Sequence, residues 1–249
     1  MKHSYLKHFF VLLLGLSPMM VWADEWKDPK TNVIYTFTPG ESVASVKAGG
    51  WPIAGSPDAT GDIAILSEIT VDGAQYAVTS IGNLAFWRVW LTSINIPEGV
   101  TSIGESAFSC CGLTSINIPK SVTEIGTAAF SDCHSLTSVN IPEGVTSIGT
   151  STFFRCNSLI SINIPKSVTS IGEGAFFECS SLTSINIPEG VTSIGESSFY
   201  ECSSLTSINI PNNVTIIGEG AFSGCSSLTS INIPNNVTSI GYYAFNNCI

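Results

Sequence analysis

One seven-residue segment, Leu-Thr-Ser-Ile-Asn-Ile-Pro or a close variant, recurs along this chain at a nearly constant interval. Its Asn falls at seven positions, 22 residues apart once and 23 residues apart thereafter: Asn95, Asn117, Asn140, Asn163, Asn186, Asn209 and Asn232. A constant period of this length indicates that each unit is one coil stacked on the previous one. We therefore expect a repeat solenoid rather than a globular core, with its function on a surface rather than in a pocket.

The first 23 residues have the three parts of a cleaved secretory signal. Lys2 and Lys7 precede the apolar run from Phe9 to Leu16, and Val21-Trp22-Ala23 leads to the acidic Asp24. This pattern predicts export, to the medium or to the cell surface. The apolar run is too short to span a bilayer and no second candidate follows, so a membrane-spanning protein is not expected.

The charge balance excludes one class of partner. The formal net charge is −10, and without residues 1–23 the chain has seven basic residues against nineteen acidic ones. Phosphate binding requires clustered Lys and Arg, so a nucleic-acid partner is not expected. Charged residues make up only 11% of the chain, which predicts a largely neutral and polar exterior.

Each unit contains a strand pattern. Val139 and Ile141 alternate with Ser138 and Asn140, as in a strand with one buried face. Because every such strand is reached by a full coil and runs in the same sense, the sheet is expected to be parallel. Short Gly-rich pieces such as residues 172–176 are too brief for a stable α-helix and predict a turn or a single turn of 3₁₀ helix.

A second motif accompanies the strand. Eight copies of Ile-Gly-x-x-x-Phe or a close form run from Ile81-Gly82 to Ile240-Gly241, with the Phe four residues after the Gly. Over residues 78–248 the chain resembles the leucine-rich repeat, and more narrowly the 23-residue BspA-like class of surface proteins in anaerobic bacteria and some parasitic protozoa. The resemblance implies a right-handed solenoid with a parallel sheet on its concave face. It also implies an adhesin that binds host or matrix proteins.

Residues 24–77 lack the repeat, so we expect the mature chain to consist of two parts. Residues 33–38 and 42–46 flank Pro39-Gly40, and residues 69–71 and 75–78 flank Asp72-Gly73, which predicts two hairpins. We interpret residues 24–77 as a β-rich N-terminal cap that covers the open end of the repeats in residues 78–249. Ile63 and Ile65 are expected to supply the first strand of the concave sheet.

The last residues, Phe245 to Ile249, fall in the middle of a unit. A final coil of this kind is expected to expose apolar side chains, each worth about 1.5 to 3 kcal/mol if buried. Two interpretations stay open: a partner chain covers this end by self-association, or the protein is a truncated member of its family.

The cysteines repeat with the coils. Seven of the eight follow the repeat Phe by three residues: Cys111, Cys133, Cys156, Cys179, Cys202, Cys225 and Cys248. Equivalent residues of adjacent coils lie about 4.8 Å apart with parallel side chains, whereas a disulfide needs Cβ atoms within about 4.5 Å that face each other. We expect a buried column of free thiols and no metal site. Cys110 lies outside this column and is expected to be exposed.

Two surfaces are candidates for binding. The Ser and Asn of the strands form two polar columns on the concave face, interrupted by the apolar Ile160: Ser138, Asn140, Ser161, Asn163, Ser184, Asn186, Ser207 and Asn209. These columns either bind a protein or glycan ligand or merely satisfy one another along the sheet. Phe154, Phe177 and Tyr200 follow the repeat Phe in neighbouring coils and form an aromatic ridge, which either contacts a partner or packs over the coil corners.

Two charged columns are also expected. Glu98, Lys120, Glu143, Lys166 and Glu189 follow successive prolines, and their alternating signs predict exposed ion pairs worth about 0.2 to 1 kcal/mol each. Glu173, Glu196 and Glu219 stack like on like, as a solvated acidic edge or a calcium site.

The sequence contains little that suits catalysis. The mature chain has a single histidine, His134, beside Cys133. Adjacent residues seldom point the same way and Cys133 belongs to the buried column, so we expect no enzyme, no cofactor and no catalytic residue. The predicted function is an exported or cell-surface binding and adhesion module. The alternative is a passive structural or assembly protein that stacks through its C-terminal coil.

Overall fold

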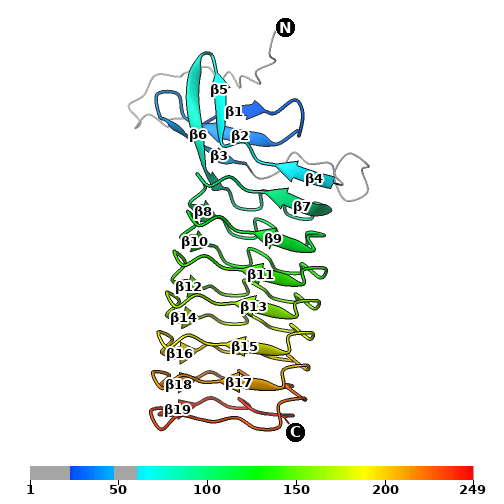
Figure 1. Cartoon of the computed structure of the whole chain (residues 1–249), viewed down its shortest axis with the longest axis vertical. Helices are drawn as coiled ribbons and strands as arrows, with labels where there is room; N and C mark the ends of the chain where they lie inside the picture. The colour runs from blue at the N-terminus through cyan, green and yellow to red at the C-terminus, as the bar shows by residue number, and fades with distance from the viewer. Residues whose placement is uncertain (1–22, 48–60, 249) are drawn as a thin grey trace, which may run out of the picture.

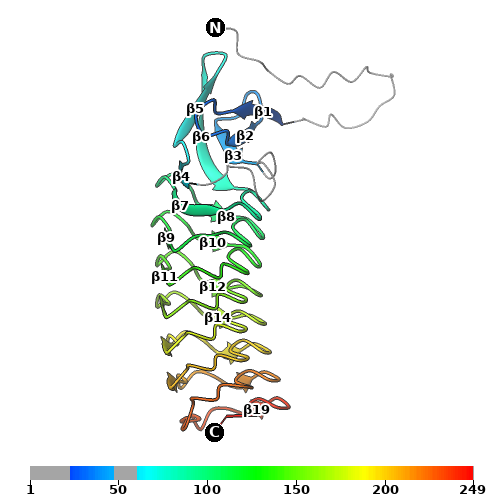
Figure 2. The ribbon, with the colours of Figure 1, turned by 90° about the vertical axis from the view of Figure 1, so that its right-hand side faces the viewer.

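The computed structural model describes residues 23–47 and 61–248, so the predicted signal segment lies outside the described residues except for Ala23. Figures 1 and 2 show a stack of coils along one long axis, with the antiparallel strands of residues 24–77 at one end and β19 at the other. The described residues contain strands and turns but no helix. Accordingly, no helix within this part of the chain could cross a membrane.

The predicted strands form one side of the coils. Val139 lies opposite Ile116 and Ile162 in parallel register, with Ser and Asn side chains outward and the apolar residue between them buried. The strand at Ile63 pairs with the repeat strand at Ile94, as predicted. These strands are β4 (Gly61–Ala64), β7 (Leu91–Asn95), β9 (Ser115–Asn117), β11 (Ser138–Asn140), β13 (Ser161–Asn163), β15 (Ser184–Asn186) and β17 (Ser207–Asn209).

A second parallel ladder forms at the Thr-Ser-Ile-Gly segment, where the sequence analysis predicted no strand. Its strands have only two residues, too few for an alternating pattern to be recognised in the sequence. After the end of β6 (Ala74–Ile81) they are β8 (Ser102–Ile103), β10 (Glu124–Ile125), β12 (Ser147–Ile148), β14 (Ser170–Ile171), β16 (Ser193–Ile194), β18 (Ile216–Ile217) and β19 (Ser239–Ile240). The ladder is interrupted between β10 and β12.

The third side of each coil is the Gly-x-x-x-Phe turn, which confirms the turn rather than the 3₁₀ alternative. Here too the backbone is paired between coils: Ala128 N donates to Thr150 O and Asp132 N donates to Phe154 O, at 3.0 and 2.7 Å. Both donors have positive φ, 53° for Ala128 and 57° for Asp132. Phe130 N, between them, donates to Thr152 O at 3.0 Å, so every second N–H group of the turn faces the next coil. The turn therefore contributes a third ladder of hydrogen bonds.

The repeat phenylalanines form the centre of the core. Neighbouring rings from Phe86 to Phe245 stack with centroids 5.3 to 5.6 Å apart and planes within 10° of parallel. The rings from Phe86 to Phe222 are completely buried. Leu, Val and Ile of the two ladders surround this column, so each coil buries apolar surface against its two neighbours as well as within itself.

Both predicted hairpins of the N-terminal part are present. β2 (Ile34–Phe37) pairs antiparallel with β1 (Asp24–Lys27) and β3 (Val43–Val46), and β5 (Glu68–Val71) pairs antiparallel with β6. β3 then lies parallel to β6, which continues into the first coil across the predicted boundary at residues 77 and 78. Tyr35 is buried between these elements and its hydroxyl accepts a hydrogen bond from Leu66 N at 3.0 Å. That this part acts as a cap stays a prediction.

At the other end, the last described coil is more open than those before it. Ile233 and Ile240 are 37% and 49% exposed, whereas their counterparts in the preceding coil, Ile210 and Ile217, are buried. Tyr242 and Tyr243, which follow in the same coil, are among the most exposed large side chains.

Candidate functional site

The Ser/Asn face is the surface made by the outward Ser and Asn side chains of β11, β13, β15 and β17, together with Ile160. All these side chains are exposed, and Ile160 is 51% exposed. The strands align them in columns because Ser pairs with Ser and Asn with Asn in register. The structure therefore brings together all nine predicted residues of this surface: Ser138, Asn140, Ile160, Ser161, Asn163, Ser184, Asn186, Ser207 and Asn209.

The amides of this face satisfy one another only in part. Asn163 Nδ2 donates to Asn140 Oδ1 at 3.2 Å. Among the described residues, the side chains of Asn186 and Asn209 have no comparable hydrogen bond, so their donors and acceptors stay available to a ligand. The bordering threonines differ: Thr137 Oγ1 donates to Thr114 O at 3.1 Å, and Thr206 Oγ1 donates to Thr183 O at 3.2 Å. The threonine column thus reinforces the stack, while much of the Asn column is unused by the fold.

A hollow follows the edge of this face where the strands reach their prolines. It lies between the Asn column and the charged column that follows the prolines. The residues that line it are Glu98, Asn117, Ile118, Pro119, Lys120, Asn140, Ile141, Pro142, Glu143, Gly144 and Asn163. Charges of both signs and neutral amides therefore meet at one surface.

The prediction of ion pairs along the proline edge, the column of residues that directly follows the prolines, was wrong. Within the described residues the structure has only two ion pairs, Lys47 with Glu25 and Arg155 with Glu178, and neither belongs to this column. An exposed ion pair contributes little free energy in water, and forming it costs side-chain entropy. Lys and Glu side chains one coil apart therefore gain little stability by pairing. Lys120 and its neighbours Glu98 and Glu143 thus keep their charges free.

The aromatic ridge forms as predicted, on the turn side of the coils. Phe154 and Phe177 stack with centroids 4.8 Å apart, and Phe177 and Tyr200 stack at 4.6 Å. All three rings are partly buried. The guanidinium of Arg155 lies 5.1 Å from the Phe154 ring centroid and pairs with Glu178. The ridge therefore packs over the coil corners and still presents an apolar edge to solvent.

The acidic column on the turn side consists of Glu173, Glu196 and Glu219, and all three are exposed. In the part of the chain that the structure describes, no group of three or more His, Cys, Asp or Glu side chains comes close enough to hold a metal ion. The geometry thus gives the calcium alternative no support.

The cysteine column is confirmed in the structure. All eight cysteines are free, those from Cys111 to Cys225 are buried, and Cys110 is exposed. Burial raises the pKa of the Cys133 thiol from 9.0 to about 12. Such a thiol stays protonated at neutral pH and is a poor nucleophile.

Cys133 and His134 do not form a catalytic pair. Cys133 Sγ donates to Phe108 O at 3.0 Å inside the core. His134 Nδ1 lies 2.8 Å from Asn157 Oδ1 and 3.0 Å from Arg155 O, on the outside of the next coil. The two side chains are thus engaged on opposite sides of the backbone.

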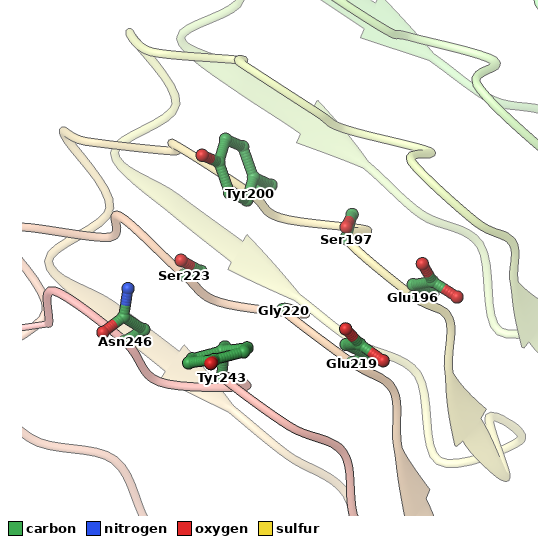
Figure 3. A pocket seen from close by; sticks show the side chains of 8 residues that line it. All are labelled: Glu196, Ser197, Tyr200, Glu219, Gly220, Ser223, Tyr243 and Asn246. Atoms are coloured by element: carbon green, nitrogen blue, oxygen red, sulfur yellow. The ribbon is translucent and has the colours of Figure 1, made fainter.

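The sequence analysis missed an open hollow at the C-terminal end of the aromatic ridge (Figure 3). Eight residues from three successive coils line it: Glu196, Ser197, Tyr200, Glu219, Gly220, Ser223, Tyr243 and Asn246. The sequence signal for this hollow is a change at two repeat positions. Ser223 follows Tyr200 at one position, and Tyr243 follows Gly220 at the other.

Each coil contributes one longer strand, one two-residue strand and one turn. A stack of such coils is the architecture of a leucine-rich-repeat protein. The model of the BspA type leucine rich repeat region, in six copies, matches residues 66–170 and 150–249. The chain belongs to this family, and the predicted solenoid fold is confirmed.

Solved structures of bacterial proteins are similar over most of the chain. A leucine rich cell surface protein from Faecalibacterium prausnitzii A2-165 is 29% identical, with a TM-score of 0.60, and the match covers 93% of this chain and 75% of that one. A leucine rich repeat protein from T. pallidum is 26% identical, with a TM-score of 0.60 and coverage of 90% and 89%. Among curated proteins no match was found.

Proposed function

We propose that this chain is an exported or cell-surface, non-enzymatic binding module whose Ser/Asn face recognises a protein or glycan ligand. The observation that carries the proposal is the pair of exposed amides, at Asn186 and Asn209, that the fold of the described residues does not use. The similarity to a leucine rich cell surface protein supports the location.

The chemistry of the face favours a neutral, polar ligand. Amide and hydroxyl groups both donate and accept hydrogen bonds, and they lie here in two straight columns without any charge. Ile160 adds one apolar contact to this surface, and the hollow at the proline edge extends it. A ligand that presents a repeating set of hydroxyl or peptide groups would match this arrangement.

The direct test is binding of the folded repeats to a panel of matrix proteins and glycans, with two matched double variants. Asn186→Ala with Asn209→Ala removes amides from the Ser/Asn face, and Asn212→Ala with Asn235→Ala removes exposed amides from the proline edge. We expect saturable binding that the first pair weakens at least tenfold and the second leaves within twofold. No saturable binding, or equal losses from both pairs, would contradict the proposal.

Export has its own test. If residues 1–23 are a signal segment, the secreted product begins at Asp24, and mass spectrometry of the intact protein measures this directly. A product that retains the first 23 residues and stays inside the cell would contradict export.

A second candidate function is assembly through the last coil onto a second copy. The exposure of Ile233 and Ile240 favours it. Light scattering should then detect oligomers that Ile240→Ser with Phe245→Ser abolishes. A monomer at all concentrations would remove this candidate.

A further inference from the structure

The hollow of Figure 3 lies where the aromatic ridge ends. Phe177 has a ring on each side, whereas Tyr200 has Phe177 on one side only. In the next coil the equivalent position is Ser223, which is too small to cover the other side of the Tyr200 ring. Among the described residues no second ring contacts Tyr200, so the ridge ends in an uncovered aromatic surface.

A second tyrosine borders the same space. Tyr243, which is 71% exposed, lies in the coil that follows Gly220 and Ser223. In Figure 3 the backbone of Gly220 and Ser223 runs between the two tyrosines, with Glu196 and Glu219 towards one end of the hollow and Asn246 at the other. Two aromatic side chains thus flank a floor of small residues.

The charge around the hollow has a single sign. Glu196 and Glu219 are exposed, and neither forms an ion pair within the described residues. From residue 167 to residue 249 the sequence contains six Glu and not one Lys, Arg or His. The Glu201 carboxylate is the main cause of the raised pKa of Tyr200, which is consistent with a negative local potential.

An uncovered aromatic surface beside unpaired carboxylates suits one kind of ligand. A guanidinium group stacks on an aromatic ring and donates several hydrogen bonds to carboxylates. A neutral sugar can also stack and donate to carboxylates, but it has no positive charge to balance theirs. We propose that the hollow between Tyr200 and Tyr243 binds an arginine side chain of a basic polypeptide partner. This site lies on the turn side of the coils and does not depend on the Ser/Asn face.

The proposal is tested with a short peptide, acetyl-Gly-Arg-Gly-Arg-Gly-amide, and its citrulline analogue, which keeps the shape but lacks the charge. Isothermal titration of the full chain at low salt should give saturable binding of the arginine peptide. The citrulline peptide should bind at least tenfold more weakly. Equal affinities for the two peptides, or no saturable binding of either, would overturn the proposal.

Two variants assign the binding to this hollow. Tyr200→Ser introduces the residue that the next coil already has at this position, so the coil is expected to fold, and the affinity should fall about tenfold. Glu196→Gln with Glu219→Gln should also weaken binding at least tenfold. The matched control, Glu124→Gln with Glu189→Gln, removes two exposed charges elsewhere and should leave the affinity within twofold.

The controls separate a site from a general charge effect. Equal losses from both glutamine pairs would show that only the net charge of the chain attracts the peptide. If Tyr200→Ser keeps its melting temperature and its affinity, the aromatic part of the proposal is wrong. If sedimentation shows that the peptide merely displaces a second copy of the chain, the assigned occupant is wrong.

Discussion

The thiol of Cys133 donates a hydrogen bond to the backbone carbonyl of Phe108 across 3.0 Å, and that carbonyl also accepts from Cys111 N at 3.2 Å. The same thiol-to-carbonyl contact recurs in every coil from Cys111 to Cys248, at 3.0 to 3.2 Å. Each cysteine therefore fills a core position and also links its coil to the one before it. None of the eight thiols forms a disulfide, although the chain is predicted to be exported.

The stability of the fold should fall at high pH because of these thiols. Burial holds the pKa of Cys133 and of Cys225 at about 12, against 9.0 for a free thiol. Below pH 9 the thiols are protonated in both states, so their contribution is fully present. Between about pH 9 and 12 the unfolded chain releases these protons and the folded chain keeps them, so the free energy of unfolding decreases with pH.

The expected slope is up to about 1.4 kcal/mol per pH unit for each buried thiol that ionises only in the unfolded state. Urea unfolding at several pH values between 8 and 11 measures it. In the double variant Cys156→Ala with Cys179→Ala two thiols are missing, and the slope should be shallower by the equivalent of two protons. A slope identical to that of the unaltered chain would assign the effect to other groups.

Reactivity of the thiols should differ sharply between the folded and unfolded states. Cys110 is exposed, Cys248 is partly exposed, and the other six thiols are buried. A thiol reagent at pH 8 should therefore modify Cys110 first and Cys248 more slowly, and all eight cysteines only after unfolding without reductant. Cys110→Ser should remove the fast phase. Fewer than eight free thiols in the unfolded protein would reveal disulfides and contradict the column.

The glycine of the Ile-Gly motif should be essential in some coils and replaceable in one. A Cβ added at Gly195 would lie 2.5 Å from the carbonyl carbon of Gly172 in the preceding coil. At Gly149, where the second ladder is interrupted, the nearest atom would be the hydroxyl oxygen of Thr152, at 3.5 Å. The steric demand therefore depends on how closely two coils approach.

Gly195→Ala should lower the free energy of unfolding by about 1 to 3 kcal/mol, because the backbone of one coil must move. Gly149→Ala should change it by less than about 1 kcal/mol, in either direction, since the site is open and the unfolded chain loses entropy. Chemical denaturation of the two variants side by side provides the comparison. Similar destabilisation by both would mean that the spacing of the coils is uniform.

The period and the alternation of single residues were sufficient to predict the row of parallel strands and the buried columns, although the row is divided into sheets of two or three strands. Val139 between Ser138 and Asn140 is a local signal, and a strict repeat carries it from coil to coil. The two-residue strands, such as Ser147–Ile148, were missed because their pairing depends on neighbouring coils and not on a local pattern. The repeat period alone does not predict which backbone groups of neighbouring coils pair.

The candidate sites show the same limit. The columns on the Ser/Asn face follow directly from the repeat, so their members could be named from the sequence. The hollow beside Tyr200 depends instead on departures from the repeat in two later coils, at Ser223 and Tyr243, which bring unlike residues together. The charges at Lys120 and its neighbours were placed correctly but not paired, because solvent competes with each contact.

Ile160 offers a test that separates binding from stability on the Ser/Asn face. It occupies the position of Thr137 and Thr183, and its side chain is 51% exposed. Ile160→Thr should leave the free energy of unfolding within about 0.5 kcal/mol, because the residue is on the surface and its neighbours show that threonine fits there. Thr137 Oγ1 donates to the carbonyl of Thr114, and the new hydroxyl can donate to Thr137 O in the same way.

If ligands bind to the Ser/Asn face, the same substitution should weaken that binding two- to tenfold, because one apolar contact is lost. Chemical denaturation and a binding titration on one protein preparation measure both quantities. The matched control is Ile216→Thr, which replaces an exposed isoleucine of the second ladder, 48% exposed, with no expected effect on the ligand. Unchanged affinity in Ile160→Thr would place the ligand elsewhere on the solenoid, and a large loss of stability would show that Ile160 supports the fold.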